Sequence, residues 1–563
     1  MGLGVLEDTK LAQVPGTSDV YDQERIDGGH ANITGLKYDY SGKVPIILVP
    51  QPSDDPNDPL NWPLWRRDLI LAVLSWVTVL CTTLSSIMAP NTLNIAEDDD
   101  ITITGAALLT GYHLCGVGVA GILIVPTARV WGKRHLFLIG HVLMIVSCVW
   151  AGASGTNATS LLWARIFQGV ALAPFEALVN ACVGDLYFLH ERGKRMAVSN
   201  VALFGAAFLT PVLVGKITAT LHWKWSFYFV AIFLAAALPL MFFFVPETAY
   251  RRADYLNTDF KHKTQNRNGS PEAERPLSRE SNGEEPKNLP MEGLNGMSST
   301  QVTVQQPVLE KDSFIKTLRP FNGRKTDENF FKLLLRPFPL FFHPSVFWAC
   351  LIQGVIIGWA VFLGVILAIV FLTPPLWFTE VQTGYLYTGA FIGSMLGLVL
   401  SGLLSDSMNK VMIRLNHGRY EPEFRILLVI FQLIFCGIGL YGFGWTAGDA
   451  EHYHWLLPDV FLMFIIIGMV MGAVAGSLYI VDAHREIAVE AFTCLLVFKN
   501  MFSFVLTFYA YDWFSHGGVK HTMIVVGSIE VGICMLSIPM YVFGKRNRSF
   551  FARHDILEML NLW

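Results

Sequence analysis

The chain contains about twelve apolar stretches, each long enough to cross a bilayer, in two sets of six separated by a polar segment. A helix rises about 1.5 Å per residue, so roughly 20 apolar residues span the hydrocarbon core. A six-plus-six layout is typical of secondary transporters built from two repeats. The sequence therefore predicts an all-α membrane protein whose 12 transmembrane helices form two pseudo-symmetric six-helix bundles. The predicted spans are residues 69–89, 104–126, 136–152, 161–181, 197–219, 226–245, 346–372, 384–404, 426–446, 458–480, 488–510 and 522–543.

Polar segments divide the chain into five predicted regions. The segment between the two sets of spans is rich in Glu, Arg, Asn, Ser and Pro, a composition that buries too little apolar surface to fold. We therefore predict a largely disordered cytoplasmic linker there. The regions are an N-terminal tail at 1–68, a first bundle at 69–252, the linker at 253–345, a second bundle at 346–543 and a C-terminal tail at 544–563.

Composition excludes several function classes. Hydrophobic residues make up 53% of the chain and charged residues 15%, whereas a soluble domain has roughly 25% charged residues. The net charge of -4 gives no support to a nucleic-acid partner. The eight cysteines lie in apolar stretches without CxxC spacing, and neither an HExxH motif nor a phosphate-binding GxxxxGKS/T loop occurs. We predict no enzymatic activity, no cofactor, no metal site, no nucleic-acid partner and a monomer.

The charges of the predicted loops define a topology. Basic residues fall on one side of the spans throughout, and the acidic run 97–100 falls on the other. Cytoplasmic loops are the ones enriched in Lys and Arg, so both termini are predicted to be cytoplasmic. We predict a multi-pass protein of the plasma membrane, although a vacuolar membrane would need the same helices. The sequon at Asn157 lies in an outer loop and is a predicted glycosylation site.

Charged side chains at membrane depth are costly and mark candidate functional positions. Glu176 in the fourth span is the strongest candidate, because a carboxylate there can bind a proton, a cationic substrate or a buried base. The alternative is a structural ion pair or a protonated hydrogen-bond donor. Lys499 lies in the middle of the eleventh span, beside Asn500. Lys499 either binds a solute group, pairs with Glu176 across the two halves, or extends along its helix towards water.

Uncharged polar residues complete the predicted binding set. His113 can change its protonation in the physiological pH range, but a histidine that only bridges helices is the alternative. Amide side chains can orient a solute, and the aromatic residues near them suit amphipathic molecules. The residues predicted to bind substrate or to couple protons are Glu176, Gln168, Asn180, His113, Gln353, Lys499 and Asn500.

The loops on the basic side carry a predicted gate. The loop VPTARVWGKRH at 125–135 can bridge to an acidic helix end, and GLLSDSMNK at 402–410 is its counterpart in the second half. Pure topology signalling by basic loops is the alternative. The predicted gating residues are Arg129, Lys133, Arg134, Asp185, Arg195 and Asp406.

Several of these motifs resemble those of one family. The pattern R-x-x-Q-G at Arg165, Gln168 and Gly169, the loop at 132–134 and the segment GAAFLTPVLVGKI with Pro211 resemble the motifs of fungal major facilitator superfamily transporters of the drug:proton antiporter type. The resemblance implies the twelve-helix major facilitator fold, alternating access and proton coupling, with Arg165, Gly169 and Pro211 as structural motif residues. The usual loop aspartate is replaced by Arg129, which puts any lock based on that aspartate in doubt.

Further segments resemble a single subfamily, that of the yeast histidinol/polyamine permease. They are LVPQPSDDPNDPLNWPLWRRD, DLYFLHERG, HWKWSFYF, PETAYRR, RLNHGRYEPEFR and PMYVFGKRNR. A polycation site should be rich in carboxylates, whereas the spans offer one convincing carboxylate, Glu176, together with the positive Lys499.

Three functional hypotheses follow. The first is proton-coupled efflux of a small organic compound, such as a drug or a fungal secondary metabolite. The second is a proton-coupled uptake permease for polyamines or related organic cations. The third is a sensor that signals through the tether at 253–325 without transport. The predicted partners are a small organic solute, protons and the lipid bilayer.

Overall fold

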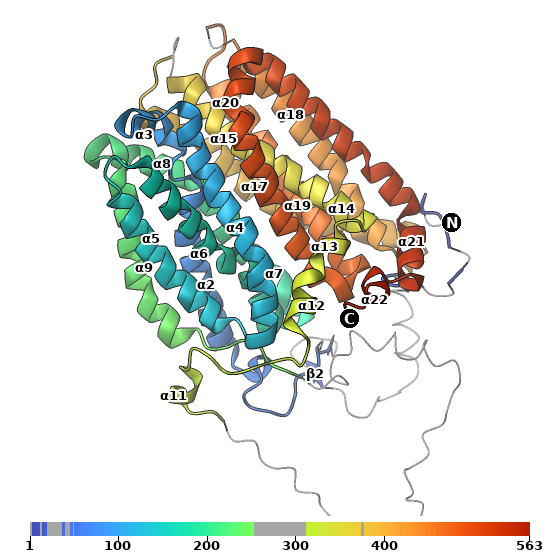
Figure 1. Cartoon of the computed structure of the whole chain (residues 1–563). Helices are drawn as coiled ribbons and strands as arrows, with labels where there is room; N and C mark the ends of the chain where they lie inside the picture. The colour runs from blue at the N-terminus through green and yellow to red at the C-terminus, as the bar shows by residue number, and fades with distance from the viewer. Residues whose placement is uncertain are drawn as a thin grey trace, which may run out of the picture.

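The computed structural model describes residues 3–8, 10–11, 14–19, 37–39, 46–48, 50–252, 311–372, 376–417, 419–449 and 451–563. Long helices packed side by side make up nearly all of it (Figure 1). Most of the predicted linker, residues 253–310, lies outside the described residues. Residues 311–343 contain three short helices, α11 (Phe314–Thr317), α12 (Phe330–Leu335) and α13 (Pro337–Leu340).

The first half is a bundle in which long helices alternate in direction. Helices α4 and α5 each pack on α6, and α9 packs on α5. Three short helices and a π-helix connect the long ones. The elements are α2 (Leu64–Ser86), η2 (Ala89–Asn91), α3 (Thr92–Asp98), α4 (Ile103–Trp131), α5 (Arg134–Gly152), α6 (Ala158–Leu186), α7 (Leu189–Asn200), the π-helix η3 (Val201–Gly205), α8 (Ala206–Leu221) and α9 (Lys224–Phe244).

The second half repeats this architecture. Helices α17 and α18 pack on α19, and α20 packs on both α15 and α18. A second π-helix, η6, interrupts its first membrane-length helix. The elements are α14 (Pro344–Ala349), η6 (Cys350–Val355), α15 (Ile356–Leu372), α16 (Glu380–Tyr385), α17 (Thr388–Leu415), η7 (Pro422–Leu428), α18 (Val429–Ala447), α19 (Leu456–Ala483), α20 (Ala488–Met535), α21 (Ser537–Arg553) and α22 (Ile556–Met559).

Helix α20 is two helical segments joined at Gly518. Gly518 has φ of 67°, a left-handed conformation that glycine adopts without steric cost. The Oγ1 of Thr522 donates a hydrogen bond back to the carbonyl of Trp513, at 3.4 Å, so the chain reverses there. By length and composition, 11 helical stretches of the described residues are able to cross a membrane, and the last of them contains both segments of α20.

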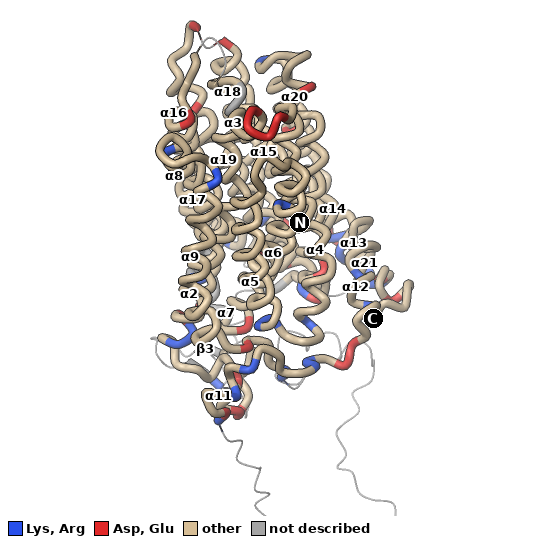
Figure 2. Tube along the Cα trace, turned by 60° about the vertical axis from the view of Figure 1, so that its left-hand side comes forward, with Lys and Arg blue, Asp and Glu red and all other residues tan. Residues whose placement is uncertain are grey.

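The surface of the bundle is apolar where a soluble protein would be polar. Large side chains such as Ile139, Leu213 and Val399 are each more than half exposed. Charged residues gather at the two ends of the bundle and leave its middle nearly free (Figure 2). An apolar belt between two charged ends is the pattern of a protein surrounded by lipid.

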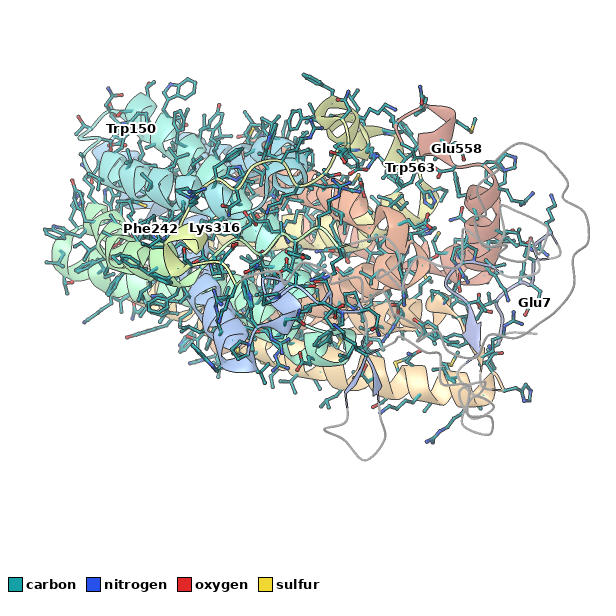
Figure 3. The ribbon with its side chains drawn as sticks, turned by 90° about the horizontal axis from the view of Figure 1, so that it is seen from below. Glu7, Trp150, Phe242, Lys316, Glu558 and Trp563 are labelled. Atoms are coloured by element: carbon teal, nitrogen blue, oxygen red, sulfur yellow. The ribbon has the colours of Figure 1, made fainter. Side chains whose placement is uncertain are left out.

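The first and last described residues meet at one end of the molecule, here called the termini end. The backbone N–H of Leu6 donates to the carbonyl of Val542 at 3.0 Å, and the ammonium of Lys545 lies 2.6 Å from the carboxylate of Glu7. Seen from below, Glu7 lies over the second half with Trp563, whereas Lys316 lies over the first half (Figure 3).

The described residues between 3 and 19 form an N-terminal strap across the second half. Strand β1 (Ser18–Asp19) pairs antiparallel with β4 (Arg419–Tyr420), and β2 (Tyr38–Asp39) pairs with β3 (Ile46–Ile47). Below the strap, the buried guanidinium of Arg548 binds Glu421 at 2.9 Å and Glu423 at 2.8 Å and also donates to the carbonyl of Pro15. The pKa of Glu421 is lowered, because hydrogen bonds from Lys545 and the charge of Arg548 outweigh the effect of burial.

Candidate functional site

A central cavity of about 170 Å³ lies between the two halves. The first half contributes side chains from α2, η2, α3, α4, α6, η3 and α8, and the second contributes side chains from α15, α19 and α20 and Tyr387 just before α17. Hydrocarbon side chains form most of its wall, and hydroxyl groups are distributed among them. The apolar lining includes Leu114, Leu172, Leu203, Phe204, Phe208, Ile357, Val361, Val365 and Met469, and the hydroxyl-bearing lining is Thr82, Ser85, Ser86, Thr92, Thr110, Tyr387 and Ser503.

Glu176 and Lys499 form an ion pair on the wall of this cavity. Glu176 comes from α6 of the first half and Lys499 from α20 of the second, and each side chain is 11% exposed. They are the only charged residues that line the cavity within the described part of the chain. The pair therefore joins the two halves electrostatically and leaves the cavity with no net charge.

The other predicted binding residues lie at different distances from the cavity. Asn500 lines it, and its Nδ2 donates to the carbonyl of Leu496 at 3.0 Å. His113 is fully buried behind the wall, with Nε2 3.4 Å from the hydroxyl of the lining residue Ser85. Gln353 belongs to η6 and does not line the cavity.

Gln168 is part of a buried cluster around Arg165 that lies away from the cavity. The guanidinium of Arg165 donates to the carbonyl of Leu84 at 2.8 Å, to that of Leu109 at 3.3 Å and to Oε1 of Gln168 at 2.8 Å. Gln168 in turn donates to the carbonyl of Ser147 at 3.2 Å. These bonds tie α6 to α2, α4 and α5, so the two residues position the helix that carries Glu176.

Gly169 and Asn180 also help to position α6. A Cβ at Gly169 would lie 2.0 Å from the carbonyl oxygen of His113, so only glycine lets α4 and α6 approach this closely. Asn180 accepts a hydrogen bond from Ser199 at 2.6 Å and donates to Asn200 at 3.2 Å. It thereby connects α6 to the residues just before η3, whose Leu203 and Phe204 line the cavity.

One predicted gating residue bridges the two halves at the termini end. Arg129 at the end of α4 binds Glu490 at the start of α20, at 2.8 Å, and Glu328 of the linker, also at 2.8 Å. Arg336 binds the same two carboxylates, at 3.5 Å from Glu490 and 3.0 Å from Glu328. Sequence reasoning missed Glu490, Glu328 and Arg336 as gate partners, because charged residues at predicted helix ends read equally well as topology signals.

The remaining predicted gating residues make contacts within a half. Lys133 binds Asp185 at 2.6 Å, and the pKa of Lys133 is raised because this carboxylate outweighs the effect of burial. The second half has a matching pair, Arg425 with Asp482 at 3.0 Å. Asp406 is exposed and is not part of that pair.

Arg134 and Arg195 hold neighbouring segments of the first half. Arg134 donates to the carbonyl of Phe242 at 2.7 Å and to that of Leu318 at 3.2 Å. Arg195 lies 3.4 Å from Asp68.

The end opposite the termini is closed by backbone packing. A Cβ at Gly384 would lie 2.7 Å from the carbonyl oxygen of Pro211, so α16 and α8 touch along their backbones. Asn94 of α3 donates to Glu380 of α16 at 3.2 Å. Asn157 lies at this end, where it is exposed and caps the start of α6.

Two bundles of membrane-length helices, with a central cavity between them and an ion pair across it, define a secondary transporter. The sequence model of the Major Facilitator Superfamily matches residues 71–505, and the chain belongs to that family. The family consists of transporters and not of enzymes.

Similar proteins are found among fungal transporters. Protein HOL1 of Saccharomyces cerevisiae is 24% identical over 98% of this chain and 97% of its own length. The MFS transporter cpaT of Aspergillus oryzae is 25% identical, covering 88% of this chain and 90% of its own. Among solved structures, a D-xylose-proton symporter has a TM-score of 0.57 at 14% identity, covering 85% of this chain and 99% of that one, which shows the shared fold.

The cavity also contains functional candidates that the sequence did not reveal. Ser85, Ser86, Thr110 and Ser503 present hydroxyls to its wall. Serine and threonine are ordinary in transmembrane helices, where they bond to the preceding turn of their own backbone. Their sequence positions therefore give no signal of the cavity.

Proposed function

We propose that this protein is a proton-coupled exporter of a small, partly apolar organic compound, a drug or a fungal secondary metabolite, by alternating access. The observation that carries the proposal is the Glu176–Lys499 ion pair on the cavity wall. A proton on Glu176, or a solute group that binds either partner, removes the attraction between the halves at that point. Proton binding and solute binding then compete for one carboxylate, which is the requirement for exchange of one for the other.

The lining of the cavity supports the proposal that the solute is small and partly apolar. Its lining is mostly hydrocarbon, with hydroxyls from three or more helices of the first half. Such a surface binds an amphipathic molecule through apolar contact and uses hydrogen bonds to orient it. The charges of Glu176 and Lys499 cancel, so the cavity has no field that would select a polycation.

The same proposal includes a membrane arrangement. Each segment of α20 crosses once, which gives twelve crossings, and the two termini share one end. That end carries Arg129, Lys133 and Arg134, so it faces the cytoplasm of a plasma-membrane protein, and Asn157 at the other end is available for glycosylation. The protein works as a monomer.

The test is export of rhodamine 6G, an amphipathic dye, from yeast cells that lack their own drug exporters. Glu176→Gln at equal surface expression is expected to lower gradient-driven export at least about tenfold, a loss of about 1.4 kcal/mol or more in coupling. Glu451→Gln, the same substitution at an exposed loop position, is the matched control and should export normally. Equal export by Glu176→Gln and the native protein would contradict the proposal.

A second candidate, uptake of polyamines or related organic cations, is favoured by one observation. Asp99 at the end opposite the termini is 7% exposed, and both its carboxylate oxygens lack a hydrogen-bond partner among the described residues. The pKa of Asp99 is raised by burial and by Asp98, against the opposing effect of Lys224. Labelled spermidine uptake that falls in Asp99→Asn, in cells without another polyamine permease, would favour this candidate over export.

A further inference from the structure

A second carboxyl group lies inside the second half, away from the cavity. Glu530, in the returning segment of α20, is 1% exposed and accepts a hydrogen bond from Nε2 of Gln432 at 2.8 Å. The thiol of Cys534, one turn along the same helix, lies 3.8 Å from the same carboxyl oxygen. No Lys, Arg or His of the described residues forms an ion pair with Glu530, and the thiols of Cys534 and Cys436 are the titratable groups beside it.

The hydrogen bonds around Glu530 lack one donor. Oε2 of Glu530 and Oε1 of Gln432 are both buried, and neither has a partner in the described part of the chain. A carboxylate and an amide oxygen are both acceptors, so an ionised Glu530 leaves two acceptors without a hydrogen. A protonated Glu530 supplies an O–H at this place. An ionised carboxylate with no basic partner is costly inside a membrane protein, which favours the protonated form.

Gln432 connects this carboxyl to a π-helix. Its Nε2 also donates to the carbonyl of Ile352 in η6, at 3.0 Å. A π-helical turn breaks the regular ladder of backbone hydrogen bonds, and such turns are frequent at functional sites. Gly472 of α19 provides the space for the amide, because a Cβ there would lie 2.1 Å from Oε1 of Gln432.

The same π-helix touches the helix that carries Lys499. A Cβ at Gly354 in η6 would lie 2.4 Å from the ring of Phe498 and 3.5 Å from the Cα of Lys499. Glu530, Gln432, η6 and Lys499 therefore form a continuous path of contacts from the interior of the second half to the cavity. The path ends at the ion pair with Glu176.

We propose that Glu530 is a second proton-binding site, in the half that lacks Glu176, and that its protonated form holds Gln432 on η6 beside Lys499. Release of the proton leaves a negative carboxylate that attracts the Nε2 of Gln432 more strongly, which draws this amide away from the carbonyl of Ile352 and loosens η6. The proton site stands on its own geometry. Its effect on transport rests on the proposed function.

Infrared spectroscopy tests the proton site without any transport. The full-length protein in lipid nanodiscs is expected to show a carboxylic-acid C=O band at about pH 7 that is lost in Glu530→Gln and retained in Glu176→Gln. Gln432→Leu keeps the carboxyl and removes its amide partner, so the same band should persist and shift in frequency. A spectrum that is unchanged by Glu530→Gln would show that Glu530 is ionised and would overturn the proposal.

Hydrogen exchange and transport test the link to η6. Protection of the amides of residues 350–355 is expected to fall as the pH rises in the native protein and to stay constant in Glu530→Gln, whose amide cannot ionise. Pre-loaded rhodamine 6G should still exchange across Glu530→Gln vesicles, while accumulation driven by a pH gradient falls at least about tenfold. If the protection of these amides depends on pH in the same way in both proteins, the proposed link to η6 is overturned. If neither protein moves the dye, the proposed function fails, and the infrared result still decides the proton site.

Discussion

Each half of the molecule buries a polar cluster among its membrane-spanning helices, and one cluster is built on a base and the other on an acid. The cluster of the first half is built on Arg165, whose guanidinium binds the carbonyls of Leu84 and Leu109. The cluster of the second half is built on Glu530, whose principal partner is the amide of Gln432. A guanidinium keeps its proton in proteins, whereas a carboxyl can lose or gain one. The first cluster is therefore a fixed support, and the second is a group that can change state.

The largest expected effect is the loss of the fixed support. Arg165→Ala leaves two buried carbonyls and Gln168 without their donor, so we expect the free energy of unfolding to fall by about 3–5 kcal/mol at every pH at which the protein is stable. Denaturant unfolding in detergent measures this. Arg251→Ala, at an arginine whose side chain is 66% exposed and pairs with Asp327 at 2.8 Å, is the control and should cost less than about 1 kcal/mol. If the stability lost in Arg165→Ala varied strongly with pH, the first cluster would also change its charge and would not differ from the second in this respect.

Acid is expected to destabilise the second half through a buried histidine that lies outside the membrane spans. His343 is 3% exposed, with its ring 4.6 Å from that of His484, and burial lowers the pKa of His343 from 6.5 to about 4. Below pH 6.5 the unfolded chain binds a proton at His343 that the folded protein does not yet bind. The free energy of unfolding therefore falls as the pH drops towards about 4. At about pH 5 the expected loss is on the order of 2 kcal/mol.

Hydrogen exchange of each half at about pH 5 and about pH 7 measures this loss. His343→Gln is expected to remove part of the acid sensitivity of the second half, because glutamine does not titrate, while burial also lowers the pKa of the neighbouring His484, which still titrates. An equal loss of protection in the second half of His343→Gln and of the native protein would show that the acid sensitivity does not originate at His343.

Removing the amide from the second cluster is expected to cost less than removing Arg165. Gln432→Leu deprives Glu530 and the carbonyl of Ile352 of a donor, which should lower the free energy of unfolding by about 1–2 kcal/mol near neutral pH. The cost should increase at higher pH, because the ionised carboxylate has lost its N–H partner. Thermal unfolding at about pH 7 and about pH 9 would measure it, and a cost that does not change with pH would argue against an ionisable cluster.

The smallest effect on stability is expected at the ion pair between Arg129 and Glu490, which neither cluster contacts. Arg129 is 36% exposed, so Arg129→Gln should change the free energy of unfolding by less than about 1 kcal/mol. It should nevertheless separate α4 from α20, since Glu490 keeps only Arg336. Spin labels at the exposed positions Val198 and Leu403 report the distance between the halves at this end. A distance distribution identical to that of the native protein would show that the Arg129 bridge does not hold the halves.

The sequence predicted the helices well because their signal is local. The predicted span 104–126 corresponds to α4, and the gap between 510 and 522 contains the reversal at Gly518. Hydropathy over about 20 residues is enough to locate a membrane-spanning helix, since each helix forms its backbone hydrogen bonds within itself. The contact between Lys133, in the loop after α4, and Asp185, at the end of α6, was also expected from the sequence.

The candidate site was harder to predict because it depends on helix rotation. A pairing of Glu176 with Lys499 was one of three interpretations of Lys499, and the residues are 323 positions apart. Gln168 was expected to contact solute but faces Arg165. The sequence reasoning singled out Glu176 as the one convincing carboxylate in the spans and did not single out Glu530, which is buried in the last of them. Its partner Gln432 is 98 residues away, and no local pattern connects them.

The N-terminal strap has a consequence for how the protein is made. Glu7 and the carbonyl of Pro15 leave the ribosome long before their partners Lys545 and Arg548, which lie 538 and 533 residues later in the chain. Until then the buried Glu423 lacks Arg548, and Glu421 lacks both Lys545 and Arg548 and keeps only Arg419, at 3.7 Å. The strap can close only on a chain translated through Arg548. A chain that ends before Arg548 therefore keeps two acids without their buried cations and an unattached N-terminal strap, which are features that cellular quality control can recognise.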